Sequence, residues 1–248
     1  MNQYKFSIIL PVYNGDEYLQ QAIDSLFRQT YTNWELIIID DGSTDQSGKI
    51  ADQSSKKDRR IRVYHQSNQG LLLARRQGIR RVSGNYLMAL DADDQLAETA
   101  LSKICLSLEQ THADFLFFNF SMDDMFQFPA MNTNFHNLEV FQKEKKNVIY
   151  HLIANQVDFN PIWNKVIHRN LFDPTMNYSY FGKRVSMGED LLQILPLVTA
   201  AKKIVFLDEN LYFYRINPAS MTKQKVDFGA YLSIKEVLLE FFNFVDAW

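Results

Sequence analysis

The first 120 residues alternate between short apolar runs and amphipathic stretches, a pattern typical of strands and helices in turn. Five apolar runs predict buried strands, at 6–12, 34–39, 61–65, 86–90 and 115–120. The stretches between most of them repeat apolar residues at helical spacing. Strands separated by helices in this way indicate βαβ units, so we predict an α/β fold with a mostly parallel central sheet flanked by helices.

Beyond about Ser121 the pattern becomes irregular. It predicts helices over Glu139–Ala154 and Glu189–Ala201, strands at 204–207 and 211–215, and a last helix from about Asp227. We therefore expect one continuous domain with an α/β half at 1–120 and a smaller region at 121–248. The last helix carries apolar residues that would be exposed to water unless another surface packs on them. This favours a truncated chain or a partner surface, such as an oligomer contact or a peripheral membrane contact.

Composition narrows the classes of protein. The chain has 248 residues, of which 46% are hydrophobic, so it can bury a full core. A net charge of -3 gives no reason to expect nucleic acid as a partner. Cys105 is the single cysteine, which suits the cytoplasm. The sequence shows no signal-peptide pattern at its start and no apolar run long enough to cross a membrane.

An acidic cluster, Asp91-Ala92-Asp93-Asp94, follows the apolar run at 86–90. Its carboxylates are therefore expected at the C-terminal edge of a parallel strand, where open α/β sheets place their ligands. Like charges packed this closely repel one another unless a cation or solvent neutralises them. The cluster predicts a site for Mg²⁺ or Mn²⁺ shared with a nucleotide diphosphate. The alternative is a solvated turn that caps the helix starting near Ala97.

A second acidic pair, Glu189-Asp190, follows Gly188 at the predicted start of a helix. Asp190 offers a base separate from the cation site. A helix N-terminus favours the ionised form of a carboxylate, so we expect it to lower the basicity of Asp190 somewhat. The alternative is an N-cap without chemistry. The sequence has no P-loop, no dinucleotide-binding glycine motif and no histidine cluster with metal-ligand spacing.

Taken in order, these residues resemble the inverting glycosyltransferases of family 2, which have the GT-A fold with a Rossmann-like sheet. The matching segments lie between residues 6 and about 222: Pro11-Val12-Tyr13-Asn14, Asp40-Asp41-Gly42-Ser43-Thr44-Asp45, Asn68-Gln69-Gly70-Leu71, Ala74-Arg75, Gly78, Gly84-Asn85-Tyr86, Asp91-Ala92-Asp93-Asp94, Trp163-Asn164-Lys165, Gly188-Glu189-Asp190, Tyr214-Arg215 and Ser220.

The resemblance assigns the nucleotide-sugar side of the site. It implies that Tyr13 stacks on the base, that Asp41 accepts a hydrogen bond from it and that Pro11 shapes the pocket floor. Asn68 and Arg75 are implied to contact the nucleotide, although Arg75 could instead belong to an exposed arginine-rich helix face. Within the segment Asp91-Ala92-Asp93, Asp93 is implied to bind the cation, and Asp91 to reach the ribose or the metal's water shell.

The resemblance also assigns the acceptor side. Asp190 is implied to be the general base, with Glu189 orienting it or the acceptor. Trp163 and Lys165 are implied to line the acceptor side, although core packing is the alternative for Trp163. The late segment with Tyr214, Arg215 and Ser220 is implied to close over the diphosphate.

The reaction implied is transfer of one sugar, preferably from a UDP-sugar, to a glycan, lipid-linked or protein acceptor at the cytoplasmic face. Processive synthases of the superfamily carry a Gln-x-x-Arg-Trp segment, and no tryptophan here follows an arginine. One rival is a nucleotidyltransferase, which would need a glycine- and lysine-rich signature after the first strand. The other is an inactive sugar-nucleotide-binding module, which would be expected to lack the base or the cluster.

Overall fold

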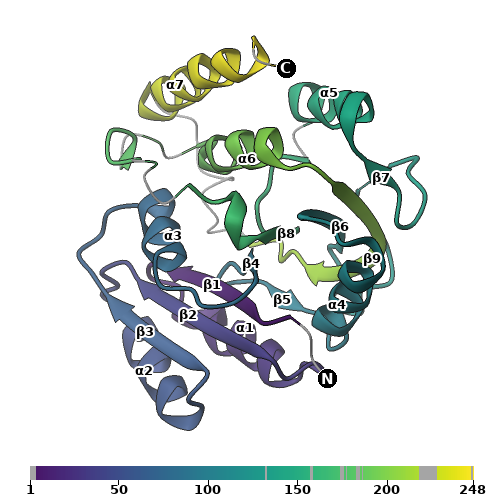
Figure 1. The fold of residues 1–248 in the computed structure, drawn as a ribbon. Coiled ribbons are helices and arrows are strands. Elements are labelled where there is room, and N and C mark those ends of the chain that lie inside the picture. Colours follow the sequence, from purple (N-terminus) through teal and green to yellow (C-terminus); the bar gives the residue numbers. More distant parts are fainter. Residues whose placement is uncertain are drawn as a thin grey trace.

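The computed structural model describes residues 4–131, 133–156, 159–173, 176, 178–182, 185, 187–217, 228–246 and 248 (Figure 1). In these residues, nine strands form one sheet in the order β3-β2-β1-β4-β8-β6-β9-β5, with β7 paired to β9. The strands are β1 Phe6–Val12, β2 Trp34–Asp40, β3 Ile61–His65, β4 Tyr86–Ala89, β5 Gln95–Leu96, β6 Phe115–Ser121, β7 Val140–Phe141, β8 Lys165–His168 and β9 Ile204–Phe213.

Helices flank this sheet (Figure 1). They are α1 Asp16–Phe27, α2 Ser47–Lys57, α3 Leu71–Ile79, α4 Ala100–Thr111, α5 Asn147–Asn155, α6 Glu189–Ala200 and α7 Phe228–Val245. Helices α5 and α7 lie at the outer end of the molecule, beyond α6 (Figure 1). The fold class expected from the sequence is confirmed, with helices packed on a central sheet.

Successive residues of β2 point to opposite faces of the sheet, and helices cover both faces. This explains why the strand reads as a continuous apolar run. Leu36 and Ile38 belong to the large core that also contains the buried face of α1. Ile37 and Ile39 pack with Ala74 of α3 on the other face. A strand buried on both faces needs apolar residues at every position. This packing sets α3 directly against the sheet.

The sheet is mixed. Strands β3, β2, β1 and β4 are parallel, but β8 pairs antiparallel with both β4 and β6. Because β8 lies between β4 and β6, the regions 1–120 and 121–248 contribute to one continuous sheet. The sequence predicted neither β8 nor the two-residue strand β5.

Two predicted elements were wrong in detail. The helix expected over 139–154 is instead the strand β7, a 3-10 turn at Lys143–Lys146 and the shorter helix α5. Val140 and Phe141 pair with β9, so a nonlocal contact overrides their local helical pattern. The two strands expected at 204–207 and 211–215 are one strand, β9. The last helix begins at Phe228, and Asp227 lies outside the described residues.

Helix α7 presents a row of exposed apolar side chains. They are Tyr231, Leu232, Leu238, Leu239, Phe242 and Val245. Among the described residues, no helix combines the length and apolar character needed to span a membrane. The partner surface expected on this helix stays a prediction.

Candidate active site

The loops after β1, β2 and β4 meet at one edge of the sheet, because these strands are parallel neighbours. The N–H of Asp41 donates to the carbonyl oxygen of Val12 at 2.8 Å, which joins the first two loops. Asp91 follows β4 at the same edge. The chain therefore brings the expected nucleotide-side and cation-side residues to a common surface, as open parallel sheets do.

The residues expected to meet the base differ in exposure. Pro11 is buried within β1, whereas Tyr13 just beyond it is 53% exposed. Asn68 lies against Gly42, where an added Cβ would come within 2.8 Å of the Asn68 nitrogen. Gly42 also has a φ of 80°, so both its conformation and this close approach require glycine.

Asp41 is buried, and its carboxylate organises the loop before α3. It accepts hydrogen bonds from the N–H groups of Gln69 and Gly70, both at 2.8 Å, and from the Gln66 side chain at 2.7 Å. These bonds fix the start of α3, the helix that carries Arg75. Contact between Asp41 and a base stays a prediction.

Arg75 joins the acidic cluster to the predicted base. Its guanidinium is 2% exposed and forms ion pairs with Asp91, at 2.8 Å, and with Asp190. Burial alone would lower the pKa of Arg75, but the carboxylates of Asp190, Asp91 and Glu189 raise it. The alternative of an exposed helix face is therefore wrong for Arg75. The guanidinium neutralises charge between two carboxylates that lie far apart in the sequence.

Asp190 lies in the first turn of α6, and its side chain is 21% exposed. Its Oδ2 accepts a hydrogen bond from the N–H of Ile162 at 3.3 Å. Burial raises the pKa of Asp190, Arg75 opposes that rise and Asp91 adds to it. The expected lowering of its basicity by the helix N-terminus is thus outweighed. Burial and the charge of Asp190 also raise the pKa of neighbouring Glu189 to about 7.

The three aspartates of the acidic cluster have different surroundings. Asp91 is 25% exposed. Asp93 accepts a hydrogen bond from the Asn217 side chain at 3.1 Å, and its pKa is raised by burial and by the charge of Asp91. Asp94 is buried and accepts from the Tyr212 hydroxyl at 2.7 Å. Asp91 and Asp93 are therefore the cluster members that could reach a cation, while Asp94 anchors the loop.

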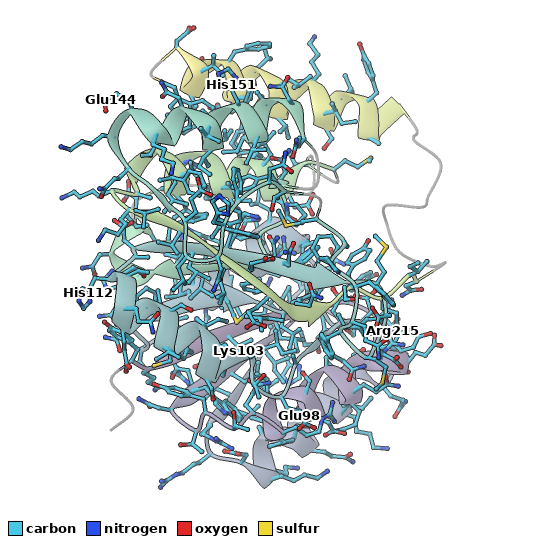
Figure 2. The ribbon with its side chains drawn as sticks, turned by 90° about the vertical axis from the view of Figure 1, so that its right-hand side faces the viewer. Glu98, Lys103, His112, Glu144, His151 and Arg215 are labelled. Atoms are coloured by element: carbon cyan, nitrogen blue, oxygen red, sulfur yellow. The ribbon has the colours of Figure 1, made fainter. Side chains whose placement is uncertain are left out.

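Arg215 secures the acidic loop from outside. Its backbone N–H donates to Asp94 at 2.8 Å, and its Nε donates to the carbonyl oxygen of Asp93 at 2.9 Å. Figure 2 shows Arg215 on the right-hand side of the molecule, well below α7. The guanidinium also lies over the ring of Tyr18 in α1. Ser220, the last residue of the matching late segment, lies outside the described residues, so the expected loop closure stays a prediction.

The two residues expected on the acceptor side lie in the interior. Trp163 is buried and stacks on Tyr212, with ring centroids 4.5 Å apart, and on Tyr214 at 5.5 Å. Lys165 is 0% exposed. Neither side chain presents itself to an acceptor at the surface, so their placement gives that role no support.

Sequence reasoning missed three groups at the site. The Tyr212 hydroxyl also accepts from the N–H of Asp91 at 3.1 Å, Asn217 binds Asp93, and Ile162 donates its N–H to Asp190. Tyr212 lies in an apolar strand, where nothing in the pattern marks its hydroxyl. The group on Ile162 is backbone, which no residue type reveals.

This mixed sheet, with an acidic loop after β4 and a carboxylate opening α6, is that of a GT-A glycosyltransferase. A crystal structure of S. aureus TarS residues 1–349 in complex with UDP-GlcNAc superposes with a TM-score of 0.75 at 19% identity, covering 95% of this chain and 66% of that one. The chain belongs to glycosyl transferase family 2, whose family model matches residues 7–172.

Curated relatives agree with this family. The chain is 34% identical over 221 residues to the uncharacterized glycosyltransferase EpsJ of Bacillus subtilis, covering 88% of this chain and 62% of EpsJ. It is 31% identical over 242 residues to glycosyltransferase GlyG of Streptococcus pneumoniae, and the match covers 93% of this chain and 77% of GlyG. Glycosyltransferase GlyA of the same organism is 30% identical, and the match covers 88% of this chain and 32% of GlyA.

Proposed function

We propose that this protein transfers a single sugar from a UDP-sugar to a hydroxyl group, with inversion, a divalent cation and Asp190 as general base. The observation that carries the proposal is the guanidinium of Arg75, which binds both Asp190 and Asp91. It puts the candidate base next to the carboxylates at the carboxyl edge of the parallel strands. An inverting single displacement needs one base and no covalent nucleophile.

A divalent cation fits the residues of the acidic loop. Asp91 and Asp93 provide hard oxygen donors. Burial and the charge of Asp91 raise the pKa of Asp93, and a bound cation would favour its ionised form. Among the described residues, no group of three or more His, Cys, Asp and Glu side chains could hold a metal. Mg²⁺ typically uses one or two carboxylates together with substrate phosphates. When bound, Mn²⁺ or Mg²⁺ would supply positive charge against the departing diphosphate.

The nucleotide side of the proposal rests on Tyr13 and its neighbours. The exposed ring of Tyr13 is free to stack on a base, and Asp41 and Asn68 lie in the adjoining loops. The fold neighbour TarS was solved with UDP-GlcNAc and with UDP. We therefore propose a UDP-sugar as the donor, with Arg75 close to the bound nucleotide.

In the proposed step, the acceptor hydroxyl gives its proton to the carboxylate of Asp190. The oxygen forms a bond to the anomeric carbon while the bond from that carbon to the diphosphate oxygen breaks, and the diphosphate leaves with the electron pair. A carboxylate with a raised pKa is a stronger base, and partial exposure leaves Asp190 open to an acceptor. The neighbouring Glu189 would help to orient Asp190 or the acceptor.

We propose a glycan, a lipid-linked sugar or a protein as the acceptor class. The absence of a Gln-x-x-Arg-Trp segment from this sequence supports addition of one sugar at a time. A single cysteine suits a reducing compartment, which supports a cytoplasmic location, at or near the inner membrane face.

The test compares the native chain with Asp190→Asn in UDP-sugar binding and in transfer to a panel of acceptors. The expected result is unchanged donor binding and a transfer rate at least about 100-fold lower, as general-base removal produces. Native transfer by Asp190→Asn would refute the base assignment. Donor binding without any transfer by the native chain would instead indicate an inactive binding module.

A further inference from the structure

We propose that Lys165 is a positioning residue for Asp190 and acts through the loop 161–164. The proposal rests on the proposed role of Asp190 as base. The loop leads directly into β8, the strand between β4 and β6. Lys165 is its first strand residue, and its side chain turns back beneath the loop instead of reaching the surface.

The ammonium of Lys165 ties the loop together. Its Nζ donates to the carbonyl oxygen of Pro161 at 2.6 Å and to Oδ1 of Asn164 at 2.5 Å. Nζ also lies 4.6 Å from the ring centre of Phe159, a cation-π contact. Two hydrogen bonds thus hold both ends of a short loop in one conformation.

The loop in turn holds the carboxylate of Asp190. The N–H of Ile162, one residue after Pro161, donates to Oδ2 of Asp190 at 3.3 Å. Oδ1 of the same carboxylate binds Arg75. The two oxygens are therefore fixed by different parts of the chain, and Oδ2 depends on the loop that Lys165 secures.

The rest of the loop is anchored to the sheet. The Asn164 side chain donates to the carbonyl oxygen of Phe118 in β6 at 3.1 Å, and Trp163 is locked between aromatic rings. At the other end of the loop, Lys165 donates a hydrogen bond to Pro161, next to Ile162. Loss of this bond would free the segment whose N–H donates to Asp190.

Packing alone does not explain a lysine at this position. Lys165 lines a small cavity of about 20 Å³, whose other lining residues are apolar apart from Arg75 and Gln193. Burial lowers the pKa of Lys165 to about 7, with the charge of Asp190 opposing the change. An apolar side chain would avoid this desolvation cost, so the amine is better explained by the bonds it makes.

The first experiment compares Lys165→Met with Lys146→Met. Lys146 is a matched control because it is also buried and donates to the carbonyl oxygens of Thr199 and Ala201, at the end of α6 far from Asp190. We measure UDP-sugar affinity, thermal unfolding, kcat and the pH profile of kcat. Lys165→Met should lower kcat by about 10- to 100-fold and shift the profile, because misplaced catalytic groups cost this much. Donor affinity should stay within twofold, and Lys146→Met should keep native kcat.

A double-mutant cycle with Asp190→Asn separates positioning from general destabilisation. If Lys165 acts through Asp190, Lys165→Met should lower residual transfer no further in the Asp190→Asn background. An equal loss in both backgrounds, or native kcat in folded Lys165→Met, would overturn the proposal. Native transfer by Asp190→Asn alone would instead remove the base assignment on which the proposal rests.

A second variant keeps the idea testable if Lys165→Met does not fold. Ile162→Pro removes the N–H donor to Asp190 while leaving Lys165 in place. It should reproduce the drop in kcat with native donor affinity. Native kcat in Ile162→Pro would overturn the proposal, since the donor through which Lys165 acts would then be dispensable.

Discussion

Asp91 and Asp190 bind the same guanidinium, that of Arg75, although they follow different elements far apart in the sequence. Through these ion pairs, the acidic loop after β4 and the start of α6 interact electrostatically. A change in the charge at either carboxylate is therefore felt at the other through a buried cation. This coupling distinguishes Arg75 from the exposed Arg80, which directly follows the same helix.

Replacing Arg75 with lysine should disable the site and destabilise the fold. One ammonium cannot pair both carboxylates as a planar guanidinium does, so one of them would stay partly buried without a charged partner. We expect the free energy of unfolding to fall by about 3 kcal/mol and transfer to fall at least about 100-fold. Urea unfolding and transfer assays measure both, with Arg80→Lys as the control. A native unfolding midpoint in Arg75→Lys would contradict the bridging role.

Replacing Asp93 with asparagine should weaken the response to Mn²⁺. The substitution removes one of two carboxylates that could meet a cation, so half-maximal transfer should need at least about tenfold more Mn²⁺. The measurement is a Mn²⁺ titration of transfer after treatment with a chelator. Asp124→Asn, an exposed acidic residue, serves as the control. An unchanged Mn²⁺ requirement in Asp93→Asn would argue against Asp93 as a ligand.

Gly78 allows α3 to lie close to the sheet. A Cβ at this position would come within 2.4 Å of Cγ2 of Ile9 in β1, which is shorter than any normal contact. We expect Gly78→Ala to lower the free energy of unfolding by roughly 1–3 kcal/mol, because the helix must shift away from β1. Transfer should fall as well, because Arg75 lies one turn away. Chemical denaturation checks this, with Arg80→Ala as the control, and a neutral Gly78→Ala would show that α3 can move without cost.

The sequence predicted much of this architecture and part of the site. The boundaries of β1 agree with its apolar run, because a strand buried on both faces shows its full length in the pattern. The edge strand β3 also has its expected bounds, although most of its residues are only partly buried. The short strand β8 begins with Lys165 and has no clear alternation, so only its pairing partners reveal it. At the site, the sequence marked the acidic cluster and Asp190 as candidates, but it did not predict the bridge between them through Arg75. Such a bridge depends on the register between α3 and α6, which local patterns do not encode.

Glu35 should make acid stability depend on pH. Burial alone would raise its pKa, but hydrogen bonds from Lys5, Ser7 and Ser83 lower it to about 2 from 4.5. A carboxylate with a lowered pKa in the folded state stabilises that state above pH 4.5, and the contribution is lost as the pH falls toward 2. We expect Glu35→Gln to cost on the order of 2 kcal/mol at pH 7 and little near pH 2.

The measurement is the free energy of unfolding of both proteins from pH 7 down to pH 2. Asp124→Asn again provides a surface control, for which the two curves should stay parallel. A constant difference between the native chain and Glu35→Gln over this range would mean that the contacts of Glu35 do not depend on its charge.

The central position of β8 also governs the order in which the protein can fold. Until residue 168 has left the ribosome, β4 and β6 lack the strand that joins them. The open backbone groups then lie along one side of β4 and along both sides of β6, because β9, the other partner of β6, comes later still. The nascent chain must therefore hold β6 apart from the sheet of β1 to β4 until β8 joins them. Pairing between distant segments of this kind is slow. Chaperones that shield strand edges should thus influence the yield of this protein more than they influence its final stability.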